Sequence, residues 1–277
     1  MKHFKQLLCG ASVAAAMALP GQASATTVDV ELMFMNDVSG SVTAADFNAQ
    51  IAGYAAAFRD STLIDRIQEG AIGKIAVSVA FMATDISISD WFLIEDAASG
   101  EAFATAVEGF VRPGGLGIQD NVAGLLDDAS DAFKTNAFDG TRNVIDIVTE
   151  GAQSTGGCRF SEAICAPLQN ARDAVLADNI DAINAMVLTD PSFFGPGAGF
   201  RIDSIAYAEN NIIGGDGSFV VATPDFTDFA PAIRNKIERE IVGPDPDGQI
   251  PLPAAGWMMI AGFGALAGIG RRKRAKS

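Results

Sequence analysis

One stretch of the chain decides the interpretation of the fold: Val30-Glu31-Leu32-Met33-Phe34-Met35-Asn36-Asp37-Val38-Ser39-Gly40-Ser41. Its first half is an apolar run of the kind that forms a buried strand. A Ser-Gly-Ser turn follows and leads to Thr43, a residue type that caps the first turn of a helix. The spacing puts one carboxylate and two hydroxyls on a tight loop at the carboxyl end of a strand. Open α/β sheets bind their ligands at that edge.

The chemistry of this loop allows two interpretations. Asp37, Ser39 and Ser41 offer three small, hard oxygen ligands, which suit Mg²⁺, Mn²⁺ or Ca²⁺ better than zinc. Alternatively, the same residues only form a capping turn that satisfies the free backbone N–H groups of the next helix. The sequence leaves both open.

The elements that follow alternate between strands and helices. Expected strands cover 30–35, 75–82, 86–92, 144–148, 180–188 and 219–222, and expected helices cover 43–58, 99–111, 118–133, 168–178 and 226–241. This order predicts a three-layer α/β/α, Rossmann-like domain whose central sheet is mostly parallel, with segment 86–92 as its one antiparallel edge strand.

Both ends of the chain look like targeting segments. Lys2 and Lys5 precede an apolar core and the small-residue site Ala23-Ser24-Ala25, so we expect a signal peptide over residues 1–25, cleaved before Thr26. The domain then covers residues 26–242, and 243–249 form a linker.

The last 28 residues, 250–277, carry a short motif, an apolar run and a basic tail. We expect the run, 254–270, to reach the membrane, and the basic cluster after it to stay in the cytoplasm. A permanent tail anchor is one interpretation. The arrangement also resembles PEP-CTERM sorting signals of the VPLPA type, with Ile250 in place of valine. That resemblance implies processing at Pro251, Leu252, Pro253 and Ala254 by an exosortase-type enzyme, and delivery to the cell surface or an extracellular matrix.

Charge limits the partners. Seven of the 19 basic residues lie in the two ends and all 34 acidic residues lie between them, which leaves 12 basic residues and a formal charge of −22. Such a surface repels nucleic acid and anionic membranes. We therefore expect no nucleic-acid partner, and membrane contact only through the C-terminal segment.

Histidine and cysteine narrow the chemistry further. The single histidine, His3, lies in the signal peptide, so the mature domain cannot build a Ser-His-Asp or Cys-His catalytic set. We expect no catalytic residue. Cys158 and Cys165 remain in the mature chain, and in an exported protein we expect them to close a local disulfide.

Four phrases carry a family resemblance: DVSGSV at 37–42, GYAAAFRD at 53–60, GTRNVIDI at 140–147 and NNIIGGDGSFV at 210–220. Together they resemble the bacterial domain-of-unknown-function family 1194, a branch of the von Willebrand factor A (VWA) superfamily, over residues 28–242. The resemblance implies a VWA-type fold and leaves the activity open.

The first loop resembles the metal-ion-dependent adhesion site (MIDAS) of VWA domains. In that site two serines, a threonine and two aspartates surround a divalent cation, directly or through water. Asp37, Ser39 and Ser41 match the first loop, Leu116 stands where a threonine is expected, and Glu150 stands where aspartate is usual. Asp120 is a further candidate carboxylate. The resemblance thus implies a degenerate site that holds Mg²⁺, Mn²⁺ or Ca²⁺ weakly.

These observations favour an exported, non-enzymatic adhesion or binding module at the cell surface or in the matrix, anchored to the inner membrane before processing. Its partner is expected to be an extracellular protein or polysaccharide. One alternative is a glycan-active enzyme or accessory subunit with Asp37, Asp120 and Glu150 as acid/base groups. Another is a purely structural matrix component.

Overall fold

The central strand of the molecule is β2 (Val30–Asp37), in which every residue is buried. The structure is a computed structural model that describes residues 25–155, 158, 163–189 and 203–243. β2 runs parallel to β3 (Ile75–Met82) on one side and to β7 (Asn143–Thr149) on the other. Complete burial of a parallel strand requires cover on both faces of the sheet, which explains the continuous apolar run at this point.

The sheet continues outward in the order β10-β8-β7-β2-β3-β4. β8 (Ala182–Leu188) and β10 (Val220–Thr223) extend the parallel part. β4 (Ile86–Ile88) and β5 (Phe92–Ile94) both pair with β3 in the antiparallel sense, and the two-residue β9 (Gly214–Gly215) pairs antiparallel with β8. This architecture confirms the predicted fold class.

The edge strand expected over 86–92 is interrupted in the structure. Ser89 lies between β4 and β5, and its hydroxyl accepts a hydrogen bond from the backbone N–H of Val79 (3.0 Å) and donates one to the carbonyl of Asp90 (2.8 Å). The backbone N–H of Ser89 still donates to the carbonyl of Val79 (2.9 Å), but the side chain takes the place of the return backbone bond, and the expected strand is split in two at this point.

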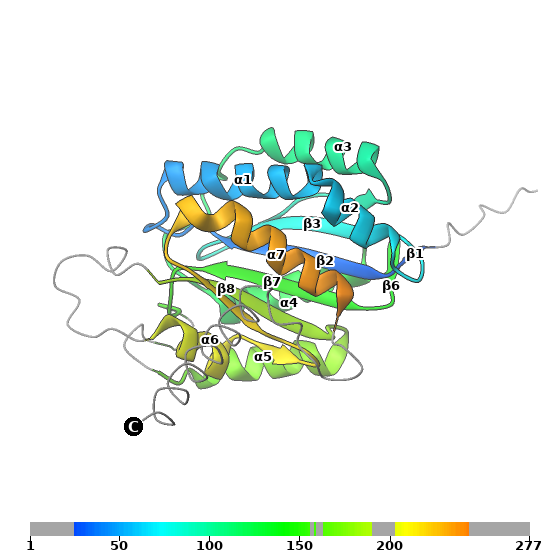
Figure 1. The fold of residues 1–277 in the computed structure, drawn as a ribbon. Helices are drawn as coiled ribbons and strands as arrows, with labels where there is room; N and C mark the ends of the chain where they lie inside the picture. Colours follow the sequence, from blue (N-terminus) through cyan, green and yellow to red (C-terminus); the bar gives the residue numbers. More distant parts are fainter. Residues whose placement is uncertain (1–24, 156–157, 159–162, 190–202, 244–277) are drawn as a thin grey trace, which may run out of the picture.

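Helices cover both faces of the sheet (Figure 1). The helices of one layer pack on one face of the sheet and enclose a hydrophobic core with it. They are α1 (Ala44–Arg59), α2 (Ser61–Gln68), α3 (Ala97–Glu108) and α7 (Phe229–Val242). The opposite layer consists of α4 (Val122–Lys134), α5 (Ala166–Asp178) and α6 (Ser204–Asn211). A 3₁₀ turn, Phe226–Asp228, precedes α7, and a small separate sheet pairs β1 (Thr26–Val28) with β6 (Phe138–Gly140).

Two expected helix starts are wrong. The helix expected from Ile118 is α4, which begins at Val122. The carbonyl of Ile118 accepts a hydrogen bond from the N–H of Gly40, and this bond holds the segment before α4 to the loop after β2. The helix expected from Ser99 is α3, and its cap is Asp96, whose carboxylate accepts the backbone N–H of Ser99. Ser99 forms the other half of that capping box. Thr43 caps α1 as expected, with Asp46 as its capping-box partner.

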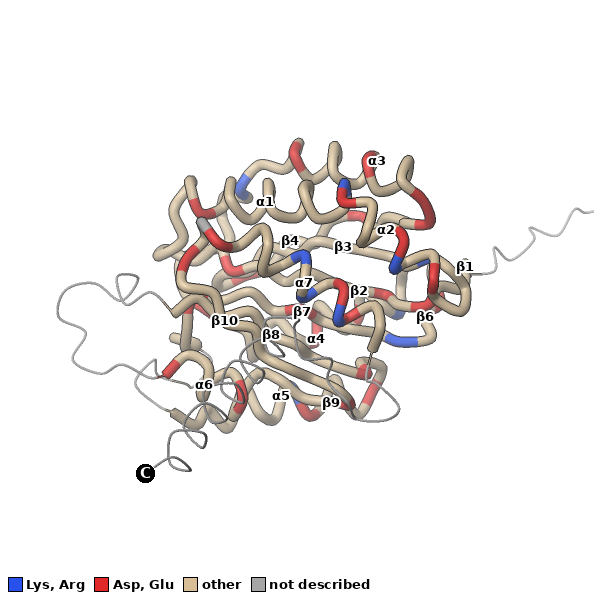
Figure 2. Tube along the Cα trace, viewed as in Figure 1, with Lys and Arg blue, Asp and Glu red and all other residues tan. Residues whose placement is uncertain are grey.

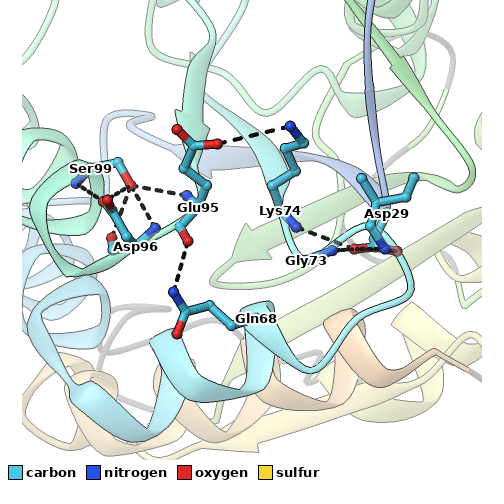
Figure 3. A network of polar contacts seen from close by, with 8 residues as sticks. Asp29, Gln68, Gly73, Lys74, Glu95, Asp96 and Ser99 are labelled. Atoms are coloured by element: carbon cyan, nitrogen blue, oxygen red, sulfur yellow. Dashed lines mark hydrogen bonds and ion pairs between the residues drawn. The ribbon is translucent and has the colours of Figure 1, made fainter.

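The amino ends of the strands are fixed by a separate polar network (Figure 3). The carboxylate of Asp29, just before β2, accepts backbone N–H groups from Ile72, Gly73 and Lys74, just before β3. Such contacts align the two strands at the edge opposite to the candidate site.

The expected disulfide between Cys158 and Cys165 is present, with the two Cα atoms 5.4 Å apart. Cys165 also precedes α5, and its sulfur accepts the backbone N–H of Leu168 at 3.4 Å. The bridge therefore fixes the loop after β7 to the start of a helix.

The two expected targeting segments fall almost entirely outside the described residues. Residues 1–24 of the expected signal peptide and 244–277, with the linker and the sorting signal, are not described. Among the residues that are described, no helix combines the length and the apolar character needed to cross a membrane.

Candidate cation site

The candidate site lies where β2 and β7 end, at the carboxyl edge of the sheet. The loop after β2 is held in place by its backbone: the N–H of Val38 donates to the carbonyl of Met82 (2.8 Å), and that of Gly40 to the carbonyl of Ile118 (3.0 Å). Each contact reaches a different neighbour, the end of β3 and the segment between α3 and α4. Three parts of the chain are thus brought together as the MIDAS-like pattern requires.

Within the first loop, the predicted ligands face one another. The backbone N–H of Ser39 donates to Oδ1 of Asp37 at 2.7 Å, and the hydroxyls of Ser39 and Ser41 lie 3.2 Å apart. Asp37 and Ser39 are 2% and 1% exposed, whereas Ser41 is exposed. The side-chain oxygens of this loop therefore range from buried, at Asp37 and Ser39, to exposed, at Ser41.

The second segment approaches the first loop by sharp turns. Gly115 and Gly117 both have a φ of 85°, a left-handed conformation that favours glycine. Beyond them, the carboxyl of Asp120 comes within hydrogen-bonding reach of Asp37 and of the Ser39 hydroxyl. The structure therefore places this further candidate inside the site.

Leu116 does not contribute an oxygen to the site. Its side chain is partly buried against the core under α1 and α3, and its backbone carbonyl accepts the N–H of Asp85 at 2.9 Å. This side chain therefore serves the hydrophobic core.

Glu150 follows β7 and completes the group. It is 4% exposed, Ser41 is near enough to lower its pKa, and its Oε1 is buried without any hydrogen-bond partner, as is Oδ1 of Asp120. Buried polar atoms without partners are rare in native proteins and call for an explanation such as an ion or water. Two orphan carboxyl oxygens beside two serine hydroxyls fit a hard cation.

Burial raises the pKa values of all three carboxyls, and the charge of Asp37 adds to the shift of the other two. Desolvation raises the pKa of Asp120 to about 8, and the neighbouring charge of Asp37 adds to the shift. Desolvation also raises the pKa of Glu150 to about 7, with a smaller contribution from Asp37, and it raises the pKa of Asp37 itself. The protein thus holds protons where a divalent cation would replace them.

Neutralising side chains are scarce at this point. None of the ion pairs in the described part of the chain involves Asp37, Asp120 or Glu150. The positive charge of Arg112 lowers the pKa of Glu150. Its Nη2 also donates hydrogen bonds to the carbonyls of Val38 (2.7 Å) and Ser39 (2.8 Å).

Two residues of the site were not predicted from the sequence. Arg112 fixes the first loop from outside, and no local signal marks it. Thr149, the last residue of β7, is 1% exposed and donates from Oγ1 to Oδ2 of Asp37 at 3.3 Å. Its position directly before Glu150, at the end of a strand parallel to β2, was a usable signal.

Carboxylates alone do not complete a metal site here. In the residues that the structure describes, no three Asp, Glu, His or Cys side chains are grouped so that they could hold one ion by themselves. Ser39 and Ser41, with water, would have to supply the remaining ligands beside Asp37, Asp120 and Glu150. Those residue types match the oxygen preference of Mg²⁺, Mn²⁺ and Ca²⁺.

The profile of one protein family, described as "Protein of unknown function (DUF1194)", matches residues 27–245. The chain belongs to this family. The match spans the described domain and confirms the resemblance inferred from the four sequence phrases. No curated protein matches the DUF1194 chain significantly.

Several solved structures are similar to the DUF1194 chain in fold. Proximal thread matrix protein 1 (PTMP1) from the mussel byssus has a TM-score of 0.50 and 13% identity, over 78% of this chain and 48% of that chain. A von Willebrand factor type A protein from Catenulispora acidiphila has a TM-score of 0.45 and 15% identity, over 78% and 43%. An aerotolerance-related membrane protein from Bacteroides fragilis NCTC 9343 has a TM-score of 0.44 and 17% identity, over 75% and 98%.

The DUF1194 chain spans about half the length of PTMP1. PTMP1 has also been solved with a zinc-occupied MIDAS motif, in a structure with a TM-score of 0.46 and 14% identity over 77% of this chain and 48% of that chain. At these identities the likeness shows the fold alone.

Proposed function

We propose that this protein is an exported, non-enzymatic binding module that holds a divalent cation and binds a partner at the same place. That place is the loop face of its VWA-type domain, which is the carboxyl edge of the sheet with the loops after β2 and β7. One observation carries the proposal. The buried carboxyls of Asp37 and Glu150 and the half-buried carboxyl of Asp120 lie beside two serine hydroxyls, and none of the three has an ion-pair partner among the described residues. Uncompensated buried charge is costly, and a bound cation removes that cost.

The affinity of this site is expected to be modest. A hard cation seeks six to eight oxygen ligands, and Leu116 provides none at the position where related sites have a hydroxyl. Glu150 reaches the site with a longer side chain than the usual aspartate and offers a carboxylate oxygen in place of the missing hydroxyl. Mg²⁺, Mn²⁺ or Ca²⁺ at millimolar concentration is the expected occupant.

The expected partner is an extracellular protein or polysaccharide. Acidic positions are spread over both helical layers and outnumber basic ones (Figure 2). A partner that offers a carboxylate would therefore be repelled by most of the surface and attracted only at the cation. This electrostatic contrast would confine binding to the loop face.

The proposal includes the localisation of the protein. The signal peptide over 1–25 would export the chain, and the C-terminal segment 250–277 would hold it at the inner membrane until an exosortase-type enzyme acts at Pro251–Ala254. The mature module would then reach the cell surface or the matrix. Mass spectrometry of the native C-terminus would distinguish processing from a permanent anchor.

The glycan-active enzyme is disfavoured by the geometry of the carboxyls. Glycosidases keep their two carboxyl groups about 5–9.5 Å apart, so that the sugar or a water fits between them. Here Asp120 is within hydrogen-bonding reach of Asp37, which is closer than either mechanism uses. Paired carboxyls at hydrogen-bond distance suit cation binding better.

Thermal unfolding tests the cation site directly. The purified chain, with its disulfide intact, is unfolded in EDTA and then in millimolar Mg²⁺, Mn²⁺ or Ca²⁺. At a hundred times the dissociation constant a cation adds about 2.7 kcal/mol, which raises the midpoint by about 5–10 °C in a domain of this size. Asp37→Ala should abolish the shift, and Asp128→Ala, which removes an exposed carboxylate on α4, should keep it. Equal midpoints with and without cations would reject the site.

Partner binding needs a second experiment. The wild-type chain and the Asp37→Ala, Ser39→Ala double variant are incubated with cell-surface or matrix extract, in cation and in EDTA. Partners that bind through the loop face are lost in the variant and in EDTA. Retention of the same partners by the double variant would move the binding surface elsewhere.

A further inference from the structure

A second group of buried charges lies between β7 and α7. Lys236 on α7 has its Nζ 2.5 Å from Oδ1 of Asp146 on β7, and 2.5 Å from Oε1 of Glu240, one turn further along α7. The side chains of all three residues are fully buried. Among the described residues, Lys236 is the one ion-pair partner of these two carboxyls, and the charges of Arg142 and Arg239 act on Glu240 from further away.

This group is poorly satisfied as a set of ion pairs. Both oxygens of Asp146 and Oε2 of Glu240 have no hydrogen bond of ordinary geometry. Nζ of Lys236 is close enough to Asp146 for an ion pair, yet it is not aligned as a hydrogen-bond donor to that carboxyl. Buried ions in such surroundings are expensive to hold, because little compensates for their lost hydration.

The surroundings are apolar and fix the positions of the three groups. Asp146 lies in the sheet between Phe34 on β2 and Asn184 on β8. The ring of Phe219 lies 5.3 Å from Nζ of Lys236. Asn184 donates to Oε1 of Glu240 at 3.0 Å, which holds this carboxyl beside the lysine.

We propose that Lys236 and Asp146 condense into an intramolecular isopeptide bond, with Glu240 as the group that transfers the protons. The bond is an amide between Nζ of Lys236 and Cγ of Asp146. It requires no metal, no cofactor and no second protein, and it does not depend on the proposed cation site.

The chemistry balances within the three side chains and one released water. The ammonium of Lys236 first gives a proton to the carboxylate of Glu240, and becomes a neutral amine with a free electron pair. That pair attacks Cγ of Asp146 in its acid form and makes the new C–N bond. Glu240 then returns its proton to the departing hydroxyl and takes one from the nitrogen. The C–O bond breaks, water leaves, and Glu240 ends protonated.

Two features of the site favour this reaction. Desolvation and the charge of Glu240 raise the pKa of Asp146 to about 7, so a large share of this carboxyl carries the proton that the leaving water needs. Fixed positions of amine and carboxyl also remove the entropic cost of bringing them together.

The product removes the problem that the reactants pose. Before the reaction the core holds a lysine cation and a glutamate anion beside a carboxylic acid, whereas afterwards it holds a neutral amide and a neutral acid. No buried charge remains, and the protonated Glu240 is beside the new carbonyl, to which it can donate. Condensation thus ends the desolvation cost of the cluster.

The bond would join α7 to the middle of the sheet. α7 is the last described element, and the chain continues from it to residues 244–277. A pull on the C-terminal side of the chain would then act on β7 through a covalent bond, and would not peel the helix from the domain.

Tryptic mass spectrometry of the full-length wild-type chain tests the proposal under denaturing conditions. The disulfide between Cys158 and Cys165 is first reduced and alkylated, because Cys158 lies in the peptide 143–159. Trypsin cannot cut after an acylated Lys236, so the expected product is a branched peptide that joins residues 143–159 to 235–239 and weighs one water less than the two alkylated peptides together. The same loss appears in the intact mass. Separate, unlinked peptides cut after Lys236 would overturn the proposal and leave a non-covalent ion cluster.

Variants assign the roles of the three residues. Lys236→Arg should lose the branched peptide, because the guanidinium is not a nucleophile at this pH. Glu240→Gln should keep the fold and greatly reduce the linked fraction, since the amide cannot shuttle protons. Glu238→Gln, on the same helix in a partly exposed ion pair with Arg234, should remain fully linked. Full linkage in Glu240→Gln would refute the role of Glu240. Because the wild-type peptides decide the main question, a variant that fails to fold does not affect it.

Discussion

Oγ1 of Thr149, at the end of β7, donates a hydrogen bond of 3.3 Å to Oδ2 of Asp37, at the end of β2. The other oxygen of Asp37, Oδ1, accepts the backbone N–H of Ser39 at 2.7 Å. Both oxygens of this carboxyl are therefore oriented by the protein, one from its own loop and one from the neighbouring strand. Thr149 also accepts the N–H of Gly151 at 3.2 Å, so the same hydroxyl shapes the turn that carries Glu150.

Thr149→Val should weaken both the fold and the cation site. The valine keeps the shape and removes the hydroxyl, which leaves Asp37 and the Gly151 N–H each short of one partner. We expect a loss of about 1–3 kcal/mol in the free energy of unfolding, measured by urea titration, and a smaller stabilisation by Mg²⁺. Thr149→Ser retains the hydroxyl and should retain most of both. An unchanged response to Mg²⁺ in the valine variant would mean that Thr149 does not orient Asp37.

Gly53→Ala should destabilise the contact between α1 and α7. A Cβ at this position would lie 2.5 Å from Cδ1 of the Phe229 ring, and that ring is fully buried against Tyr54. Alanine favours a helix by about 1 kcal/mol over glycine, but overpacking costs about 1–3 kcal/mol, so we expect a net loss in the free energy of unfolding.

A double-mutant cycle separates the clash from other effects of Gly53→Ala. Phe229→Leu makes room beside the new methyl group, so the double variant should lose less than the sum of the two single losses. Strict additivity in thermal or urea unfolding would place the damage elsewhere than at the ring.

Most of the fold could be predicted because its strands are continuous apolar runs. The segments 75–82 and 144–148 have no alternation, which is what a sheet covered on both faces imposes, and the structure confirms both. Helix starts were less predictable where tertiary contacts decide them. The segment before α4 stays non-helical because its carbonyls at Leu116 and Ile118 accept hydrogen bonds from the N–H groups of Asp85 and Gly40.

The site could be predicted only in part, for a similar reason. Asp37, Ser39 and Ser41 are neighbours in sequence, so their spacing alone indicates an oxygen-rich loop. The contributions of Arg112 and Thr149 depend on how distant segments meet, and the sequence does not contain that information locally. Lys236 and Glu240, four residues apart on a helix, look like an exposed ion pair and are in fact fully buried.

Loss of the disulfide should cost stability without changing the fold. Cys158 and Cys165 are separated by seven positions and close a small loop, for which the entropic estimate is about 2–3 kcal/mol. Reducing agent should therefore lower the urea midpoint of the wild-type chain. The Cys158→Ala, Cys165→Ala double variant should start lower and show no response to the reducing agent. If reduction shifts both proteins equally, the effect does not come from this bridge.

The stability of the cation-free protein should fall as the pH rises from about 4 to about 8. The pKa of Asp120 is raised to about 8 and that of Glu150 to about 7, whereas both titrate near pH 4 in the unfolded chain. Across this window the folded state binds more protons than the unfolded state, so each step upward in pH favours unfolding. The expected loss is on the order of a few kcal/mol, measured by urea titration in EDTA.

The Asp120→Asn, Glu150→Gln double variant isolates this contribution. Asp146, whose pKa is also raised to about 7, adds a similar slope if it remains a free acid, so the wild-type curve alone does not identify the site. The amides cannot titrate, and the double variant should therefore show a flatter curve between pH 4 and 8. Millimolar Mg²⁺ should flatten the wild-type curve in the same direction, because the cation replaces the protons that are lost, and should leave the double variant unchanged. Equal slopes of unfolding free energy against pH in both proteins would contradict this prediction. They would show that Asp120 and Glu150 ionise in the folded state as they do in the unfolded chain.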